Sequence, residues 1–488
     1  MGLKIKTLKF LAGRPVCILH EKTAKKLNLH ISDRIIITKK RKRIISVIDI
    51  AVGIVKPNEI AVSDEIINHL NLQKNSKVEV KLAPKPLSNE LIKKKLDGKK
   101  LNKKEINEII KDIANNSLTG IEIAFFVSAI YSKGFDLKET KYLIDAMLKR
   151  SNKLKINGKV GDKHSIGGGG NRTSPIIVSI CSSAGLIMPK TSSRAITSAA
   201  GTADVIETLA QIDFSTKDLK KIINKTKACF VWGGGLGLVP VDSRIIEIEK
   251  QLNIDSSSQL LASILSKKMA VDSNYIVIDI PYGPFAKVDL KKAKELKLKF
   301  SKLAKKFNLK IKVYLTKGDE PIGNGIGPVL EMIDVLKVLK RDNPSKDLEN
   351  KSLMLSASLL ELSGKSKKGK GMELAKEILY SGKAFEKFKE IIKAQKGKIK
   401  PLKLGKYKHT IYSDKTIKIK SLNNRLLNQL ARFAGCPENK SAGIYLYKKK
   451  NQRVKKGEKI LTIYSESKIK LKNAEKFLLK NKKNIILI

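Results

Sequence analysis

Glycine-rich loops alternate with apolar strands and helical stretches from about residue 156 onward. This alternation is typical of α/β domains, in which helices connect the strands of a largely parallel sheet. Two apolar runs of strand length, residues 275–280 and 310–315, are candidates for buried strands of that sheet. A Gly/Lys/Ser stretch over residues 364–371 is expected to form an exposed loop. The pattern predicts a large α/β domain over residues 156–400.

The segments on either side of this domain follow different patterns. Residues 1–84 contain short strands separated by turns, which predict a small N-terminal β-barrel-like domain. A Pro-Lys-Pro sequence ends it, and apolar residues at helical spacing predict a helical domain over residues 85–155, with a return segment near 240–270. Short alternating strands predict a C-terminal α+β subregion over residues 401–488. The expected fold class is multidomain α/β.

Chain length and hydrophobic content favour several folded domains. At 488 residues the chain exceeds one typical core, and its 42% hydrophobic residues exclude bulk disorder. No run of about 18 apolar residues occurs and no signal-type hydrophobic core follows the start, so we expect a soluble, cytoplasmic protein without a membrane partner. The cysteines at positions 17, 181, 229 and 436 are scattered, which predicts neither a disulfide framework nor a metal site.

The net charge is strongly positive, because 99 Lys and Arg residues oppose 46 Asp and Glu residues to give +53. Clustered cations bind nucleic acid, so a basic nucleic-acid-binding protein is an alternative of another class. However, the lysines are spread over nearly every helical stretch, as a general composition bias would also produce. Aromatic residues, on which bases stack, make up only 5% of the chain. We therefore expect no specific nucleic-acid partner.

A glycine loop carries the first chemical signal. Residues 162–174 read Asp-Lys-His-Ser-Ile-Gly-Gly-Gly-Gly-Asn-Arg-Thr-Ser. Consecutive glycines let backbone amides approach an anion closely, while Lys163, Ser165, Thr173 and Ser174 supply a charge and hydroxyl donors. This combination predicts a phosphate-binding loop, although it has neither the spacing of a Walker A loop nor that of a dinucleotide-binding loop. A flexible loop without a ligand is the alternative.

A second polar cluster spans residues 190–204, with hydroxyl residues around Arg194 and the sequence Gly-Thr-Ala-Asp at its end. A helix beginning at Ala203 would offer free N–H groups and the positive end of its dipole to an anion. The cluster therefore predicts the second half of an anion site. The alternative, which is compatible with ligand binding, is that Thr202 only caps the helix.

These motifs resemble the thymidine and pyrimidine-nucleoside phosphorylase family. The resemblance is carried by Lys-His-Ser-x-Gly-Gly at 163–168, Ser-x-Arg at 192–194 and Gly-Thr-x-Asp at 201–204. The block 190–198 and the N-terminal β extension are similar to the archaeal-type AMP phosphorylase branch. Blocks at 230–234, 255–268 and 279–287 also look like family blocks in the same order, so that the resemblance covers about residues 90–488.

The resemblance implies phosphorolysis of nucleoside 5′-monophosphates. AMP and phosphate would give adenine and ribose 1,5-bisphosphate, with CMP and UMP as further substrates. Inorganic phosphate is then a co-substrate, and no cofactor is implied. The family also implies a helical domain and an α/β domain separated by a cleft that closes on the substrate, and we expect a homo-oligomer, dimeric or larger. A pyrimidine-nucleoside (thymidine) phosphorylase is the alternative enzyme.

The resemblance also implies roles for individual residues. The implied phosphate contacts are Lys163, Ser165, Ser174, Ser192, Arg194 and Thr202. The implied AMP contacts are Gly167, Gly168, Ser193, Arg194, Ala195, Ile196, Thr197, Ser198, Thr202, Ser263 and Lys287. Asp255 resembles the proton donor to the leaving base, and its alternative role is to cap a helix over residues 256–268. His164 and Lys267 are further candidates, although a lone histidine beside a loop is as often structural.

The chain departs from the family pattern at two places. The AMP phosphorylase branch carries a Val-Pro pair inside the glycine loop, whereas this chain has Gly169-Gly170 and a loop one residue shorter. The ligand contact can therefore fall on either Gly167 or Gly168. Pyrimidine-nucleoside members carry an Arg-Asp pair where this chain has Ile248-Glu249. This difference disfavours a pyrimidine nucleoside as the main substrate.

Overall fold

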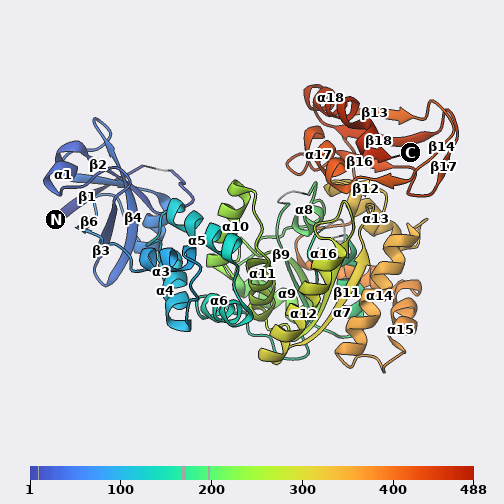
Figure 1. The fold of residues 1–488 in the computed structure, drawn as a ribbon, viewed down its shortest axis with the longest axis horizontal. Coiled ribbons are helices and arrows are strands. Elements are labelled where there is room, and N and C mark those ends of the chain that lie inside the picture. Colours follow the sequence, from blue (N-terminus) through green and yellow to red (C-terminus); the bar gives the residue numbers. More distant parts are fainter. Residues whose placement is uncertain (9, 168–171, 196–197, 488) are drawn as a thin grey trace. The chain divides into compact units, whose positions relative to one another are not determined.

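The structure is a computed structural model that describes residues 1–8, 10–167, 172–195 and 198–487 (Figure 1). The chain forms two compact units, the first from Met1–Arg150 and Pro240–Ser263 and the second from Ser151–Val239 and Ile264–Ile488. The predicted multidomain α/β class is confirmed. None of the helices in the described ranges is long and apolar enough to cross a membrane.

The first unit begins with a closed barrel whose strand order is β1-β5-β2-β4-β3-β6. Its elements are β1 (Gly2–Thr7), β2 (Val16–His20), α1 (Glu21–Lys26), β3 (Arg34–Lys39), β4 (Lys42–Ala51), β5 (Glu59–Val62), α2 (Asp64–Leu70) and β6 (Lys77–Leu82). Alternate residues along the strands are buried, such as Ile35 and Ile37 of β3 and Val78 and Val80 of β6. This alternation fills the interior of a small barrel with side chains, and it confirms the predicted β-barrel-like domain.

Helices form the rest of the first unit. They are α3 (Ser88–Leu96), α4 (Lys103–Ala114), α5 (Gly120–Lys133), α6 (Leu137–Lys149), α10 (Pro240–Leu252) and the first part of α11 (Ser257–Ala270). α4, α5 and α6 each begin with a capping box, in which a polar N-cap residue and a glutamate satisfy each other's backbone N–H groups. α10 packs against α4 and α5. The helical part therefore includes a segment that lies far along the chain.

A parallel sheet forms the centre of the second unit. β7 (Gly161–Ser165) pairs with β10 (Tyr275–Tyr282), which pairs with β11 (Lys310–Lys317). A bridge between Val160 and Ile187 connects β7 to the parallel pair β8 (Met188–Ser192) and β9 (Ala228–Trp232), so the strand order is β11-β10-β7-β8-β9. The chain runs from β7 to β9 in one direction and then returns to the other side of β7. In such sheets ligands bind at the carboxyl ends of the strands, where the order reverses.

The helices of this unit pack against the sheet and against one another. They are α7 (Thr173–Ser183), α8 (Thr202–Ile206), α9 (Thr216–Thr226), α12 (Leu290–Lys306), α13 (Pro328–Lys340), α14 (Lys346–Leu362), α15 (Gly371–Tyr380) and α16 (Lys383–Ala394). α7, α13, α14 and α16 share one apolar core with the strands, and α12 packs on β10 and β11. The two predicted buried strands are present as β10 and β11, and the predicted loop lies between α14 and α15.

The C-terminal part of the second unit contains a four-stranded antiparallel sheet in the order β12-β16-β18-β13 (Figure 1, where β13, β16 and β18 are orange to red). Its elements are β12 (Gly325–Ile326), β13 (Tyr407–Tyr412), β14 (Ile417–Lys418), β15 (Ser421–Leu422), α17 (Asn424–Ala434), β16 (Gly443–Leu446), β17 (Arg453–Val454), β18 (Lys459–Ser465), α18 (Lys468–Ile485) and β19 (Ile486–Leu487). α17 and α18 pack together and share an apolar core with this sheet. The predicted α+β subregion is thus confirmed as a fold element.

Candidate active site

The glycine loop follows β7, next to the point where the strand order reverses. Lys163 and Ser165 lie on β7, and Ser174 is buried in the first turn of α7. Gly167 has a φ of 132°, a region that favours glycine, and a Cβ there would lie 3.5 Å from Cδ of Lys287. The fold thus brings Lys287 beside Gly167. Gly168 lies outside the described residues.

Lys163 is only 1% exposed, and its Nζ donates a hydrogen bond to Thr173 Oγ1 at 2.8 Å. Burial disfavours its charged form and is the main reason why the pKa of Lys163 is lowered to about 7; Asp279 opposes this shift, and Lys190 and Lys351 add to it. A buried ammonium group whose pKa is lowered in this way gains most from an arriving anion, because the anion supplies a counter-charge. This environment agrees with the predicted phosphate contact.

Two lysines outside the set of predicted site residues contact the residue before Lys163. Lys190 Nζ lies 3.1 Å from Asp162 Oδ1 and donates to the Lys163 carbonyl at 2.7 Å, while Lys268 Nζ lies 2.6 Å from Asp162 Oδ2. Burial alone would raise the pKa of Asp162, but the two lysines outweigh burial and the pKa is lowered. Burial lowers the pKa of Lys268 to about 8. Asp162 therefore stays ionised and holds both lysines at the sheet.

Asp279 organises the neighbouring strand end. It is paired with Ser165 across β7 and β10, and its buried carboxylate accepts from Ser165 Oγ at 3.2 Å. Thr316 Oγ1 donates to the same carboxylate at 2.7 Å, and Lys351 Nζ lies 2.8 Å from it. With Lys163, Lys190 and Lys268, four lysines adjoin the two carboxylates of Asp162 and Asp279. The carboxyl end of the sheet therefore has an excess of positive charge, which suits an anion.

The second predicted segment follows β8, the neighbour of β7. Asp204 Oδ2 accepts from the backbone N–H of Ala195 at 2.7 Å and from that of Gly201 at 2.9 Å, which joins the two ends of the loop. A Cβ on Gly201 would lie 2.5 Å from the Ser193 carbonyl oxygen, so only glycine fits there. The loop is therefore closed by backbone contacts, and its middle residues Ile196 and Thr197 lie outside the described residues.

The helix after this loop differs from the expectation. α8 begins at Thr202 instead of Ala203, and Gly201 holds the N-cap position. The alternative that Thr202 caps the helix is therefore wrong. α8 spans only Thr202–Ile206, and Asp204 already accepts the Gly201 N–H, so the helix end contributes little to anion binding beyond Thr202 itself.

Ser192 and Arg194 extend this side of the site. Ser192 ends β8 and donates to the Val231 carbonyl at 3.4 Å. The Arg194 side chain is 39% exposed and pairs with Glu207 and Asp204, and its Cζ lies 5.2 Å from the Trp232 ring centroid. The guanidinium is thus held in place while part of it stays open to solvent.

The remaining candidates of this unit are His164, Ser198 and Lys267. Burial and the nearby lysines hold the pKa of His164 well below its usual range, so its ring is neutral and adds no positive charge. Ser198 Oγ donates to the Ala200 carbonyl at 3.0 Å within the loop. Lys267 is half-buried on α11, next to Lys268.

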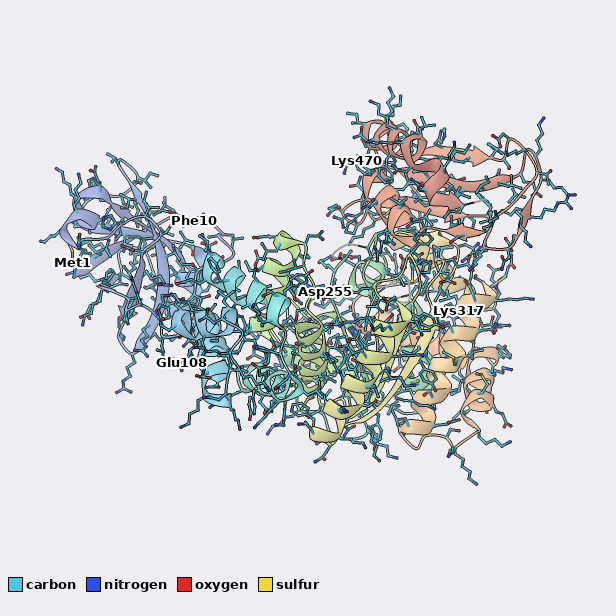
Figure 2. The ribbon with its side chains drawn as sticks, viewed as in Figure 1. Met1, Phe10, Glu108, Asp255, Lys317 and Lys470 are labelled. Atoms are coloured by element: carbon cyan, nitrogen blue, oxygen red, sulfur yellow. The ribbon has the colours of Figure 1, made fainter. Side chains whose placement is uncertain are left out.

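Two predicted site residues belong to the first unit. Asp255 is exposed and precedes α11 (Figure 2). The Ser256 carbonyl accepts the Leu260 N–H at 2.9 Å, which places Ser256 at the N-cap, so the helix begins one residue later than expected. Ser263 Oγ donates to Asp242 Oδ2 at 3.0 Å, and Asp242 is a fully buried carboxylate that the sequence analysis missed.

The described residues also bear on the other predicted properties. Among them, no group of three or more His, Cys, Asp or Glu side chains is placed to hold a metal ion. A pocket of about 700 Å³ beside α13 and α16 contains none of the predicted site residues. Figure 2 shows long side chains ending in nitrogen on both units, in line with lysines that occur along the whole sequence.

Comparisons with known proteins agree with this arrangement. Residues 89–151 match the glycosyl transferase family helical bundle domain, 157–265 match the a/b domain of that family, and 418–484 match the pyrimidine nucleoside phosphorylase C-terminal domain. The solved structure of anthranilate phosphoribosyltransferase from Thermus thermophilus covers 63% of this chain and 99% of its own, with a TM-score of 0.55 and 16% identity. That likeness supports the α/β fold.

Two relatives match nearly the whole chain. AMP phosphorylase from Thermococcus kodakarensis is 40% identical over 97% of this chain and 95% of its own. AMP phosphorylase from Methanocaldococcus jannaschii is 40% identical over 91% of this chain and 90% of its own. These matches confirm the resemblance inferred from the glycine loop and the hydroxyl cluster, and they do not favour a nucleic-acid-binding protein. The chain therefore belongs to the AMP phosphorylase branch of the thymidine and pyrimidine-nucleoside phosphorylase family.

Proposed function

We propose that this protein catalyses phosphorolysis of nucleoside 5′-monophosphates. An oxygen of inorganic phosphate attacks C1′ of AMP, and the bond from C1′ to the base breaks. The departing base takes up one proton and leaves as neutral adenine. The sugar product is ribose 1,5-bisphosphate, and CMP and UMP are further substrates. The observation that carries this proposal is the 40% identity to AMP phosphorylases over nearly the whole chain.

The chemistry requires an anion site and a proton donor. Positive charge develops on the ribose and negative charge on the leaving base, so the enzyme must hold phosphate and protonate the base. Lys163, Ser165, Ser192, Arg194 and Thr202 are proposed to hold phosphate at the carboxyl ends of β7 and β8. Asp255 is proposed to protonate the base, and Ser263 and Lys287 to contact the nucleotide. The reaction uses inorganic phosphate and needs no cofactor.

The substrate range tests this proposal directly. Purified protein is incubated with phosphate and with AMP, CMP, UMP, adenosine or thymidine, and the free base and the phosphorylated sugar are measured. We expect kcat/KM for AMP to exceed that for adenosine by more than about tenfold, because a bound 5′-phosphate adds charge-assisted hydrogen bonds. Equal use of AMP and adenosine, or a preference for thymidine, would instead indicate a nucleoside phosphorylase.

Two controls separate phosphorolysis from other reactions. Omission of phosphate should abolish base release, whereas a nucleotide hydrolase would continue to release base. Addition of EDTA should leave the rate unchanged, because the lysines supply the charge that holds the anion.

The expected homo-oligomer has its own test. Sedimentation of the same sample measures the mass of the assembly.

A further inference from the structure

The Arg194 guanidinium is held by two carboxylates on one side. Glu207 binds it in bidentate fashion, with Nη1 to Oε2 at 2.6 Å and Nη2 to Oε1 at 2.7 Å. Asp204 Oδ1 lies 3.2 Å from the same Nη1. A guanidinium has five N–H groups in a fixed plane, and these contacts use both hydrogens of Nη1 and one of Nη2.

The two remaining N–H groups form one edge of the guanidinium. They belong to Nε and Nη2, lie in the plane of the guanidinium, point in nearly the same direction and match the spacing of two oxygens of a phosphate. Within the described parts of the chain, no hydrogen bond involves Arg194 Nε. The side chain as a whole is 39% exposed, so it is not enclosed by its carboxylate partners.

Glu207 also contacts a residue from the C-terminal part of the second unit. Lys440 Nζ, from the segment between α17 and β16, is ion-paired with Glu207 Oε2, the oxygen that also accepts from Arg194 Nη1. The hydrogen bond from Arg194 is the main reason why the pKa of Glu207 is lowered to about 2, and Lys440 adds to it. Glu207 thus stays ionised at every pH at which the enzyme would be assayed.

We propose that Glu207 is a positioning residue that holds Arg194 with its Nε and Nη2 edge presented to inorganic phosphate. The inference rests on the proposed function, in which Arg194 binds that anion. A mobile arginine would lose side-chain freedom when phosphate binds, whereas Arg194 is already ordered by Glu207 and Asp204.

The test is Glu207→Gln, which keeps the size of the side chain but lets it accept from only one guanidinium nitrogen. We measure the phosphate KM and kcat with AMP, and the phosphate Kd by calorimetry without nucleotide. KM and Kd for phosphate should rise about three- to tenfold, as expected when one ordered side chain becomes mobile, and kcat should change less than twofold. Glu207→Asp keeps the charge on a shorter side chain, and its phosphate KM and Kd should lie between those of wild type and Glu207→Gln.

Lys440→Met is the matched control. Like Glu207→Gln, it removes the ion pair between Glu207 and Lys440, but it leaves Glu207 paired with Arg194. It should lower the melting temperature no more than Glu207→Gln does and change the phosphate Kd within about twofold, as is usual for a partly exposed ion pair. Equal effects of both variants on Kd would show that Glu207 only links two parts of the fold, and would overturn the proposal.

The double variant Arg194→Ala with Glu207→Gln completes the cycle. If Glu207 acts through Arg194, Glu207→Gln should have no further effect on phosphate binding once Arg194 is absent. Additive losses, or an unchanged Kd in Glu207→Gln alone, would refute the positioning role. A wild-type protein that neither binds phosphate nor cleaves AMP would instead refute the proposed function.

Discussion

Asp255→Asn is expected to lower the kcat of AMP phosphorolysis by about 10²- to 10⁴-fold while the melting temperature stays unchanged. An amide cannot donate the proton that the leaving adenine needs, so a general acid at this position is lost. Asp255 is exposed, and the N-cap position of α11 belongs to Ser256, so the substitution removes no core packing. The measurements are kcat with saturating AMP and phosphate, and thermal unfolding of both proteins.

Ser256 holds the N-cap position that the sequence offered to Asp255, and a merely structural role for Asp255 before the helix predicts a different result. Asn replaces Asp well as a hydrogen-bond acceptor near a helix start, so such a role would leave both the rate and the stability nearly unchanged. Asp136→Asn is the matched control in the same unit, because Asp136 caps α6 by accepting from the N–H groups of Lys138 and Glu139 at 2.8 Å. Retention of more than about a tenth of wild-type kcat in Asp255→Asn, well above the range for general acids, would remove Asp255 from the mechanism.

Two strands of the central sheet and the glycine loop could be predicted because their signals are local, whereas β7 and β8 were not among the predicted strands. β10 and β11 are apolar runs of strand length, and the glycine loop stands out against the strand and helix on either side of it. Lys163 and Ser165 are predictable as site residues because they adjoin that loop, and Arg194 because hydroxyl residues surround it. In each case the polar side chains lie within about a dozen residues of the sequence signal that predicts the local backbone.

The lysines around Asp162 could not be selected in the same way. Lys190 lies on β8 and Lys268 on α11, and only the fold brings both to one buried carboxylate. In a chain with 99 lysines and arginines, one further lysine carries no signal. Asp279 did leave a trace, because a carboxylate between two isoleucines of a buried strand requires a partner, and Ser165, Thr316 and Lys351 provide it.

The N-termini of α8 and α11 show a second limit of prediction from the sequence. Both α8 and α11 start within one residue of their expected positions, yet the residue at each N-cap is not the one considered from the sequence. Gly201 holds the cap of α8 because Asp204 reaches back to its N–H, and no local pattern distinguishes that arrangement from a Thr202 cap. Functional and capping interpretations of a polar residue therefore need the backbone to separate them.

Lys163→Met is expected to weaken phosphate binding by about 10- to 150-fold at pH 6, the equivalent of one charge-assisted hydrogen bond of about 1.5–3 kcal/mol. The pKa of Lys163 is lowered to about 7 by burial, so the wild-type side chain is charged at pH 6 and increasingly neutral above pH 7. The advantage of wild type over Lys163→Met should therefore shrink as the pH rises to 9. The measurement is the phosphate Kd of both proteins at each pH.

Comparison of the two proteins at each pH removes the titration of phosphate itself, because both bind the same mixture of phosphate species. Lys163→Arg is the control for charge, since an arginine stays protonated over the whole range and should keep its advantage over Lys163→Met at pH 9. Stability gives an independent check: an unfolded lysine has a pKa of about 10.4, so the unfolded chain binds the extra proton between about pH 7 and 10. Wild-type stability should consequently rise with pH across that interval relative to Lys163→Met. A constant ratio of phosphate Kd values from pH 6 to 9 would show that Lys163 does not hold the anion through its charge.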